Sequence, residues 1–180
     1  MIDLGVHSID LVRYLLGNPR VESVYGATFS KLGNRSGIKA KRDYMSSGHT
    51  EKDLFDCEDL ATAMVRFEGG AVLSVEMSFS LNGEHGDNTV QLYGTESGIK
   101  LGSGNLRLYG DMEGYLSDVT FEKNTTLDVS AAFRDEIRNF TDAILHGTPC
   151  RCPAEDGVEL MRILRGIYES AESGHEVCFG

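Results

Sequence analysis

The hydrophobic and polar positions of the chain follow successive patterns that predict a helix, a run of strands and then two more helices. Apolar residues recur every three to four positions over residues 5–16, a spacing typical of an amphipathic helix. The sequence Gly17-Asn18-Pro19 ends that helix, because glycine favours the position after a helix and proline cannot continue one. Over residues 21–29 the pattern changes to a two-residue alternation, which predicts a strand.

The middle of the chain predicts short strands joined by tight turns. The tripeptide Glu68-Gly69-Gly70 separates two alternating runs and predicts a β-hairpin between them. The expected strands of this part cover residues 60–67, 71–81, 89–93, 99–101, 106–109 and 119–122. Turns at such short intervals predict antiparallel pairing of neighbouring strands.

Two amphipathic helices and a short last strand are expected towards the C-terminus. The first helix covers residues 130–146, with Ser130 as its N-terminal cap, and the second covers residues 154–173. Their apolar stripes are Phe133, Ile137, Phe140 and Ile144, and Leu160, Ile163, Leu164, Ile167 and Ala171. We expect these stripes to pack on the sheet and residues 175–179 to add a strand. The predicted fold is therefore α+β, with helices on one face of a mainly antiparallel sheet.

Composition excludes several classes of partner. The chain has 180 residues, 41% hydrophobic and 25% charged, which suits a globular domain. Its formal net charge of −11 argues against nucleic acid and anionic membranes as partners, because both attract basic surfaces. The chain contains no apolar run long enough to span a membrane.

The four cysteines predict reduced thiols in a cytoplasmic protein rather than a disulfide or metal framework. A single residue separates Cys150 from Cys152, whereas redox and zinc pairs have two. Cys57 and Cys178 lie far from that pair in the sequence. A zinc site built from these thiols and His146 has no supporting spacing, and we expect no metal.

The residues with the clearest candidate chemistry lie in the first helix. Asp3 and His7 are four residues apart, and Asp10 follows three residues later, so a helix places all three on one face. A carboxylate beside an imidazole is suited to proton transfer near neutral pH. Three alternatives remain from the spacing: Asp3 caps the helix, Asp10 faces only solvent, or the three residues bind a metal ion with ligands from elsewhere.

A long polar stretch covers residues 31–56, between two expected strands. A segment of this length inside a compact domain is usually functional. Its candidate contact residues are Tyr44, Met45 and His49. The alternative is a solvated excursion of the chain without a binding role.

Five segments, in this order, resemble the C-terminal domain of the Gfo/Idh/MocA oxidoreductases, the family of glucose–fructose oxidoreductase and inositol dehydrogenase. The resemblance covers nearly the whole chain. The segments are IDLGVHSID at residues 2–10, EDLATAMVRFEGGA at 58–71, YGTESG at 93–98, FRDEIRNF at 133–140 and IYESAESG at 167–174.

The resemblance implies an open, mainly antiparallel sheet like that of the C-terminal domain of glyceraldehyde-3-phosphate dehydrogenase. It also implies a sugar, polyol or related hydroxy compound as substrate and homo-oligomers that form through the sheet face. His7 matches the family's catalytic acid/base, Asp3 matches the carboxylate that positions substrate and tunes the histidine, and Asp10 matches a position whose role is less certain. We expect Asp10, Tyr44 and His49 to bind the substrate.

The sequence departs from the family in one large respect. Intact members begin with a Rossmann domain that binds NAD or NADP, whereas this sequence has no G-x-G-x-x-G between a strand and a helix. We therefore expect a fragment, inactive by itself, that binds no dinucleotide. Two alternatives stay open: a non-catalytic oligomerisation or sugar-binding module, and an NAD-dependent hydrolase or lyase of the same family.

Overall fold

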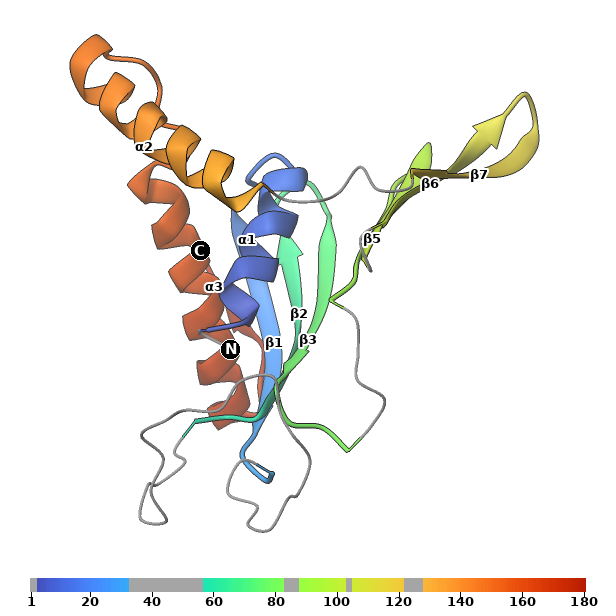
Figure 1. Cartoon of the computed structure of the whole chain (residues 1–180). Coiled ribbons are helices and arrows are strands. Elements are labelled where there is room, and N and C mark those ends of the chain that lie inside the picture. The colour runs from blue at the N-terminus through green and yellow to red at the C-terminus, as the bar shows by residue number, and fades with distance from the viewer. Residues whose placement is uncertain (1–2, 33–56, 83–87, 103–104, 122–127) are drawn as a thin grey trace, which may run out of the picture. The chain divides into compact units, whose positions relative to one another are not determined.

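The computed structural model describes residues 3–32, 57–82, 88–102, 105–121 and 128–180. In these residues the chain forms three helices and eight strands (Figure 1). The chain divides into two compact units, and each is described by itself. The first unit comprises Met1–Gly83 and Glu155–Gly180, and the second comprises Glu84–Ala154.

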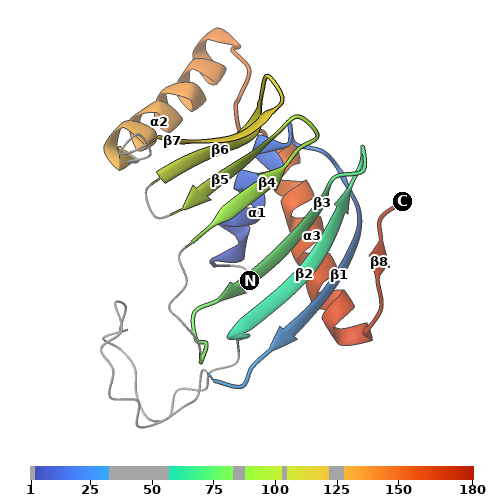
Figure 2. The same ribbon diagram turned by 90° about the vertical axis from the view of Figure 1, so that its right-hand side faces the viewer.

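The first unit is a four-stranded antiparallel sheet covered by helices on one face (Figure 2). Its strand order is β3-β2-β1-β8. The elements are α1 (Gly5–Leu15), β1 (Val21–Phe29), β2 (Leu60–Phe67), β3 (Val72–Ser78), α3 (Ala154–Ser173) and β8 (Val177–Cys178). The sequence predicted each of these elements, although β3 ends three residues earlier than expected.

The hairpin between β2 and β3 has the turn that its sequence predicted. Gly69 and Gly70 both have positive φ, +84° and +89°, which glycine adopts without steric cost. Across this turn the Phe67 amide donates a hydrogen bond of 2.9 Å to the Ala71 carbonyl. The turn therefore fixes the register of the two strands.

The core of the first unit lies between the sheet and the two helices α1 and α3. Ile9 from α1, Ile167 from α3 and Phe67 from β2 are fully buried in it. Gly26 in β1 allows α3 to approach closely, because a Cβ at that position would lie 3.0 Å from Cγ2 of Ile167. The Gly26 amide also donates a hydrogen bond of 2.9 Å to Ser170 Oγ. Close packing and a buried hydrogen bond thus attach α3 to β1.

The second unit contains a four-stranded antiparallel meander in the order β4-β5-β6-β7. Its elements are β4 (Val90–Tyr93), β5 (Ser97–Gly102), β6 (Asn105–Met112), β7 (Tyr115–Phe121) and α2 (Val129–His146). The strands β6 and β7 are longer than expected and meet at a two-residue turn, where Glu113 and Gly114 have positive φ. The α+β class and the antiparallel pairing are confirmed, and the described strands form two sheets of four rather than one sheet.

Helix α2 differs from its prediction in two ways. Its N-cap is Asp128, whose carboxylate accepts a hydrogen bond of 2.9 Å from the Ala131 amide, so the assignment of Ser130 as cap is wrong. Its apolar stripe was expected to pack on the sheet, yet Phe133 is 63% exposed and no residue of α2 is buried. The helix that buries its apolar face is α3, whose Gly166 lies close to Val24 of β1.

Candidate functional site

Helix α1 carries the three candidate residues on its solvent side. Gly5, Ile9 and Val12 of this helix are buried, and their spacing fixes which side of α1 faces the core. Asp3, in the turn before the helix, and His7 and Asp10 within it are all exposed. The fold therefore leaves these side chains accessible to a molecule outside the first unit.

Asp3 does not cap the helix. The N-cap position is Leu4, with φ −91° and ψ −46°, and no side chain makes a capping hydrogen bond there. Among the described residues, no hydrogen bond or ion pair involves the side chains of Asp3, His7 or Asp10. The structure thus removes the alternative in which Asp3 serves the helix, and leaves its carboxylate able to act on a bound molecule.

The structure gives no support to a metal site at these residues. In the part of the chain that the structure describes, no three His, Cys, Asp or Glu side chains gather in a way that could hold a metal ion. Asp3, His7 and Asp10 all belong to that part. The four cysteines are free and exposed thiols, so they form no disulfide with one another.

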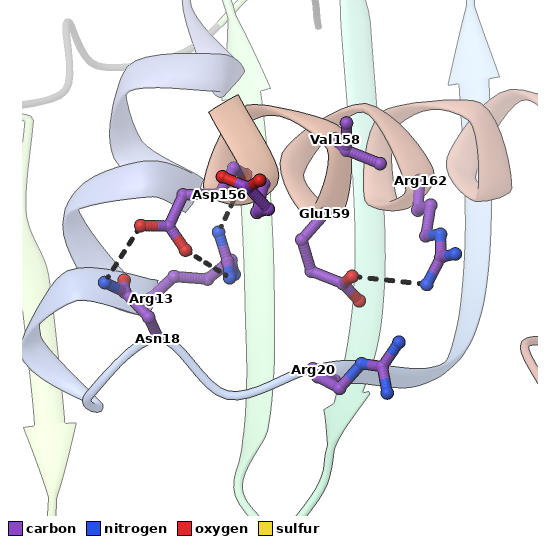
Figure 3. A pocket seen from close by; sticks show the side chains of 8 residues that line it. Arg13, Asn18, Arg20, Asp156, Val158, Glu159 and Arg162 are labelled. Carbon is purple, nitrogen blue, oxygen red and sulfur yellow. Dashed lines mark hydrogen bonds and ion pairs between the residues drawn. The ribbon is translucent and has the colours of Figure 1, made fainter. Parts of the chain in front are cut away.

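The C-terminal half of α1 is fastened to the rest of the first unit by Arg13, a residue that sequence analysis missed. Its side chain is 1% exposed. Its Nε donates a hydrogen bond of 3.3 Å to the Pro19 carbonyl. Its Nη1 donates one of 3.2 Å to the Asp156 carbonyl (Figure 3). One signal was present in the sequence, because Arg13 lies beside Val12 and four residues after Ile9, on the apolar side of the helix.

A cavity of about 290 Å³ opens beside Arg13, away from the three candidate residues. Its lining includes three arginines and three carboxylates. The buried carboxylate of Glu159 accepts a hydrogen bond of 2.8 Å from the Val21 amide and lies 3.3 Å from Arg162 Nη1. Arg13, Asp156 and Glu159 on this lining thus bind other groups of the same unit, in keeping with a structural role for them.

The candidate contact residues Tyr44, Met45 and His49 lie outside the described residues. The chain on either side of their segment is held together at the buried carboxylate of Asp59. That carboxylate accepts a hydrogen bond of 2.6 Å from the Lys31 amide and another from the Leu32 amide. The Asp59 amide in turn donates 2.8 Å to the Phe29 carbonyl. Lys31 and Leu32, which follow β1, therefore lie beside Asp59, which precedes β2.

None of the described helices is long and apolar enough to cross a membrane.

Comparison with known proteins gives a consistent result across the chain. Residues 1–179 match the family model described as "Oxidoreductase family, C-terminal alpha/beta domain" of the Gfo/Idh/MocA proteins. D-glucoside 3-dehydrogenase of Escherichia coli (strain K12) is 27% identical over 178 residues, which cover 98% of this chain and 48% of that protein. Levoglucosan dehydrogenase of Pseudarthrobacter phenanthrenivorans is 32% identical over 98 residues, or 54% of this chain and 25% of that protein.

Comparison with solved structures shows that the fold is shared. A structure of levoglucosan dehydrogenase in complex with NADH and levoglucosan matches with a TM-score of 0.76 at 22% identity. The match covers 98% of this chain and 49% of that one, so the chain spans about half the length of the relatives it matches. With a family model that extends over nearly all of its residues and the same fold, the chain belongs to the Gfo/Idh/MocA oxidoreductases, as their C-terminal α/β domain.

Proposed function

We propose that this domain is the substrate-binding and catalytic half of an NAD(P)-dependent dehydrogenase that acts on a sugar, polyol or related hydroxy compound. The observation that carries the proposal is the exposed pair Asp3 and His7 on a helix whose other side is buried. The names of two relatives, a D-glucoside 3-dehydrogenase and a levoglucosan dehydrogenase, favour a carbohydrate as the substrate.

In this proposal His7 accepts the proton of the reacting hydroxyl group. Oxidation of an alcohol releases a proton from oxygen, and an imidazole is a suitable acceptor near neutral pH. Asp3, four residues earlier, orients the imidazole and the substrate. Asp10, one helical turn further, contributes a polar contact to the substrate, together with Tyr44 and His49. In the reverse direction His7 returns the proton.

The described residues of this chain do not fit a dinucleotide. No glycine-rich turn leads from a strand into a helix N-terminus among them, and such a turn is what usually receives the pyrophosphate. NAD or NADP, which accepts the hydride in such dehydrogenases, is therefore assigned to a separate nucleotide-binding half.

The cofactor assignment gives a direct test on the isolated chain. Titration calorimetry with NAD and with NADP is expected to detect no binding in the micromolar range, because the described residues include no glycine-rich turn into a helix N-terminus for the pyrophosphate. Micromolar affinity for either nucleotide would contradict the assignment of the cofactor to a separate half.

We further propose that the domain forms homo-oligomers through the open face of the first sheet. Tyr25 in β1 lies opposite Met64 in β2, and their side chains are 53% and 56% exposed on the face away from the helices. A semi-polar face of this kind is suited to pairing with its own copy around a two-fold axis.

The oligomer is expected to become more stable as salt is added, because the net charge of −11 makes two copies repel each other. Sedimentation at micromolar concentration, at low and at physiological ionic strength, measures this. The substitution Met64→Glu adds a charge to the proposed interface and is expected to weaken association, whereas Glu172→Gln on α3 is a control away from it. A monomer at both ionic strengths contradicts the proposal.

A further inference from the structure

Arg13 is a charged residue on the core side of α1, the helix that presents the proposed catalytic pair. Ile9 and Val12 share that buried side, while His7 and Asp10 face solvent. Burial of a guanidinium is unfavourable unless polar partners replace the water that it loses. Arg13 therefore requires polar partners within the protein, and the residues that provide them indicate its structural role.

The contacts of Arg13 are mainly to backbone oxygens on two other segments. Nε donates to the Pro19 carbonyl at 3.3 Å, in the connection from α1 to β1. Nη1 donates to the Asp156 carbonyl at 3.2 Å, in the first turn of α3 and 143 residues away in the chain. The Asp156 carboxylate lies 3.7 Å from Nη2. A planar guanidinium that reaches two carbonyls in fixed positions has little freedom to turn.

The first turns of α3 also hold the connection that follows α1 (Figure 3). Asn18 Nδ2 donates 3.4 Å to Asp156 Oδ2. The Val21 amide, at the start of β1, donates 2.8 Å to Glu159 Oε1. No buried side-chain nitrogen or oxygen in the described part of the chain lacks a hydrogen-bond partner. The hydrogen bonds of Arg13, Asn18 and Glu159 thus link α1 and the start of β1 to α3.

We propose that Arg13 is a positioning residue, which fixes the rotation of α1 about its own axis and so the direction in which His7 points. This inference rests on the proposed role of His7. The apolar contacts of Ile9 and Val12 hold the helix against the core without a preferred direction, whereas hydrogen bonds require a defined geometry. His7 lies six residues before Arg13, about 9 Å along an 11-residue helix, so a change of rotation at Arg13 is passed to His7.

The test is Arg13→Lys in the whole enzyme that contains this domain. Lysine keeps the charge but lacks the planar fork, so it cannot reach both carbonyls in the same geometry. We expect kcat to fall by about tenfold to a hundredfold, because small misplacement of a catalytic group has effects of that size. KM should stay near the wild-type value, since the lost alignment matters most in the transition state.

Two further variants distinguish the effect of the position of Arg13 from the effect of its ion pair with Asp156. Asp156→Asn removes the carboxylate but keeps the carbonyl that Arg13 binds, so it is expected to lower kcat less than Arg13→Lys. Arg165→Lys is the matched control. Arg165 pairs with Glu169 at 2.6 Å on an exposed part of α3, and we expect no change in kcat. A purely structural role for Arg13 predicts a lower melting temperature with kcat per folded molecule unchanged, and that result overturns the proposal.

Amide hydrogen exchange of the 180-residue chain gives a readout that does not depend on activity. Arg13→Lys is expected to speed exchange in α1 while exchange in β1 and β2 stays the same, and Arg165→Lys is expected to change neither. Unchanged exchange in α1 overturns the inference.

If His7→Ala leaves kcat unchanged, the proposed function fails. If His7→Ala abolishes turnover while Arg13→Lys does not affect kcat, only the positioning role fails.

Discussion

Replacement of His7 by alanine is expected to lower kcat of the whole enzyme by about a hundredfold to ten-thousandfold, the usual range for a lost general acid/base. The His7 side chain is exposed and makes no hydrogen bond or ion pair among the described residues. Its removal should therefore leave the fold intact. The measurement is steady-state turnover of a sugar or polyol substrate, with circular dichroism to verify folding.

Two further variants test whether the loss of turnover is specific to His7 and Asp3. Asp3→Asn keeps the shape of the side chain but removes its charge. We expect a smaller loss of turnover, because the proposed role of Asp3 is to orient the imidazole and the substrate, not to take the proton. His175→Ala removes another exposed histidine of the first unit and is the control, with no expected change. If His7→Ala and Asp3→Asn both retain the wild-type rate, His7 is only a solvent-facing helix residue.

The elements of the first unit were predictable from local pattern because local chemistry determines them. Helix α1 was expected over residues 5–16 and extends over Gly5–Leu15. It ends where Gly17 and Asn18 adopt positive φ, which the sequence Gly-Asn-Pro signals directly. The turn between β6 and β7 was missed because its first residue is Glu113, a residue type that rarely adopts positive φ. There the Asp111 carboxylate accepts a hydrogen bond of 2.8 Å from the Gly114 amide.

The errors in the prediction come from interactions between distant residues. Helices α2 and α3 have similar apolar stripes, so periodicity alone could not show that only α3 is buried. Gly166 on α3 and Gly26 on β1 make that close packing possible, and they lie far apart in the sequence. The contacts of Arg13 were likewise not predictable from its position in the helix, because one of its partners is 143 residues away.

The candidate site was likewise predicted only in part. The spacing of Asp3, His7 and Asp10 predicted one helix face, and the structure shows all three exposed on α1 or the turn before it. Spacing could not decide whether Asp3 caps the helix, because capping depends on backbone geometry at Leu4. The catalytic roles of these residues come from the resemblance and stay a prediction.

Phe67→Ala is expected to lower the free energy of unfolding by about 3–5 kcal/mol, the usual cost of removing a fully buried phenylalanine. Phe67 is 0% exposed and belongs to the core between the sheet and the helices. The substitution removes its contacts with that core and leaves a cavity that the surrounding strands fill only in part. Since domains are usually stable by only about 5–15 kcal/mol, urea denaturation followed by circular dichroism should show a large shift.

Phe133→Ala is the matched control, because it removes the same atoms from the exposed stripe of α2. Exposed substitutions usually change stability by less than about 0.5 kcal/mol, and we expect that range here. A cost for Phe133→Ala as large as for Phe67→Ala would mean that the stripe of α2 is buried in solution. A cost below about 1 kcal/mol for Phe67→Ala would contradict the core, because a cavity of this size cannot form at so small a cost.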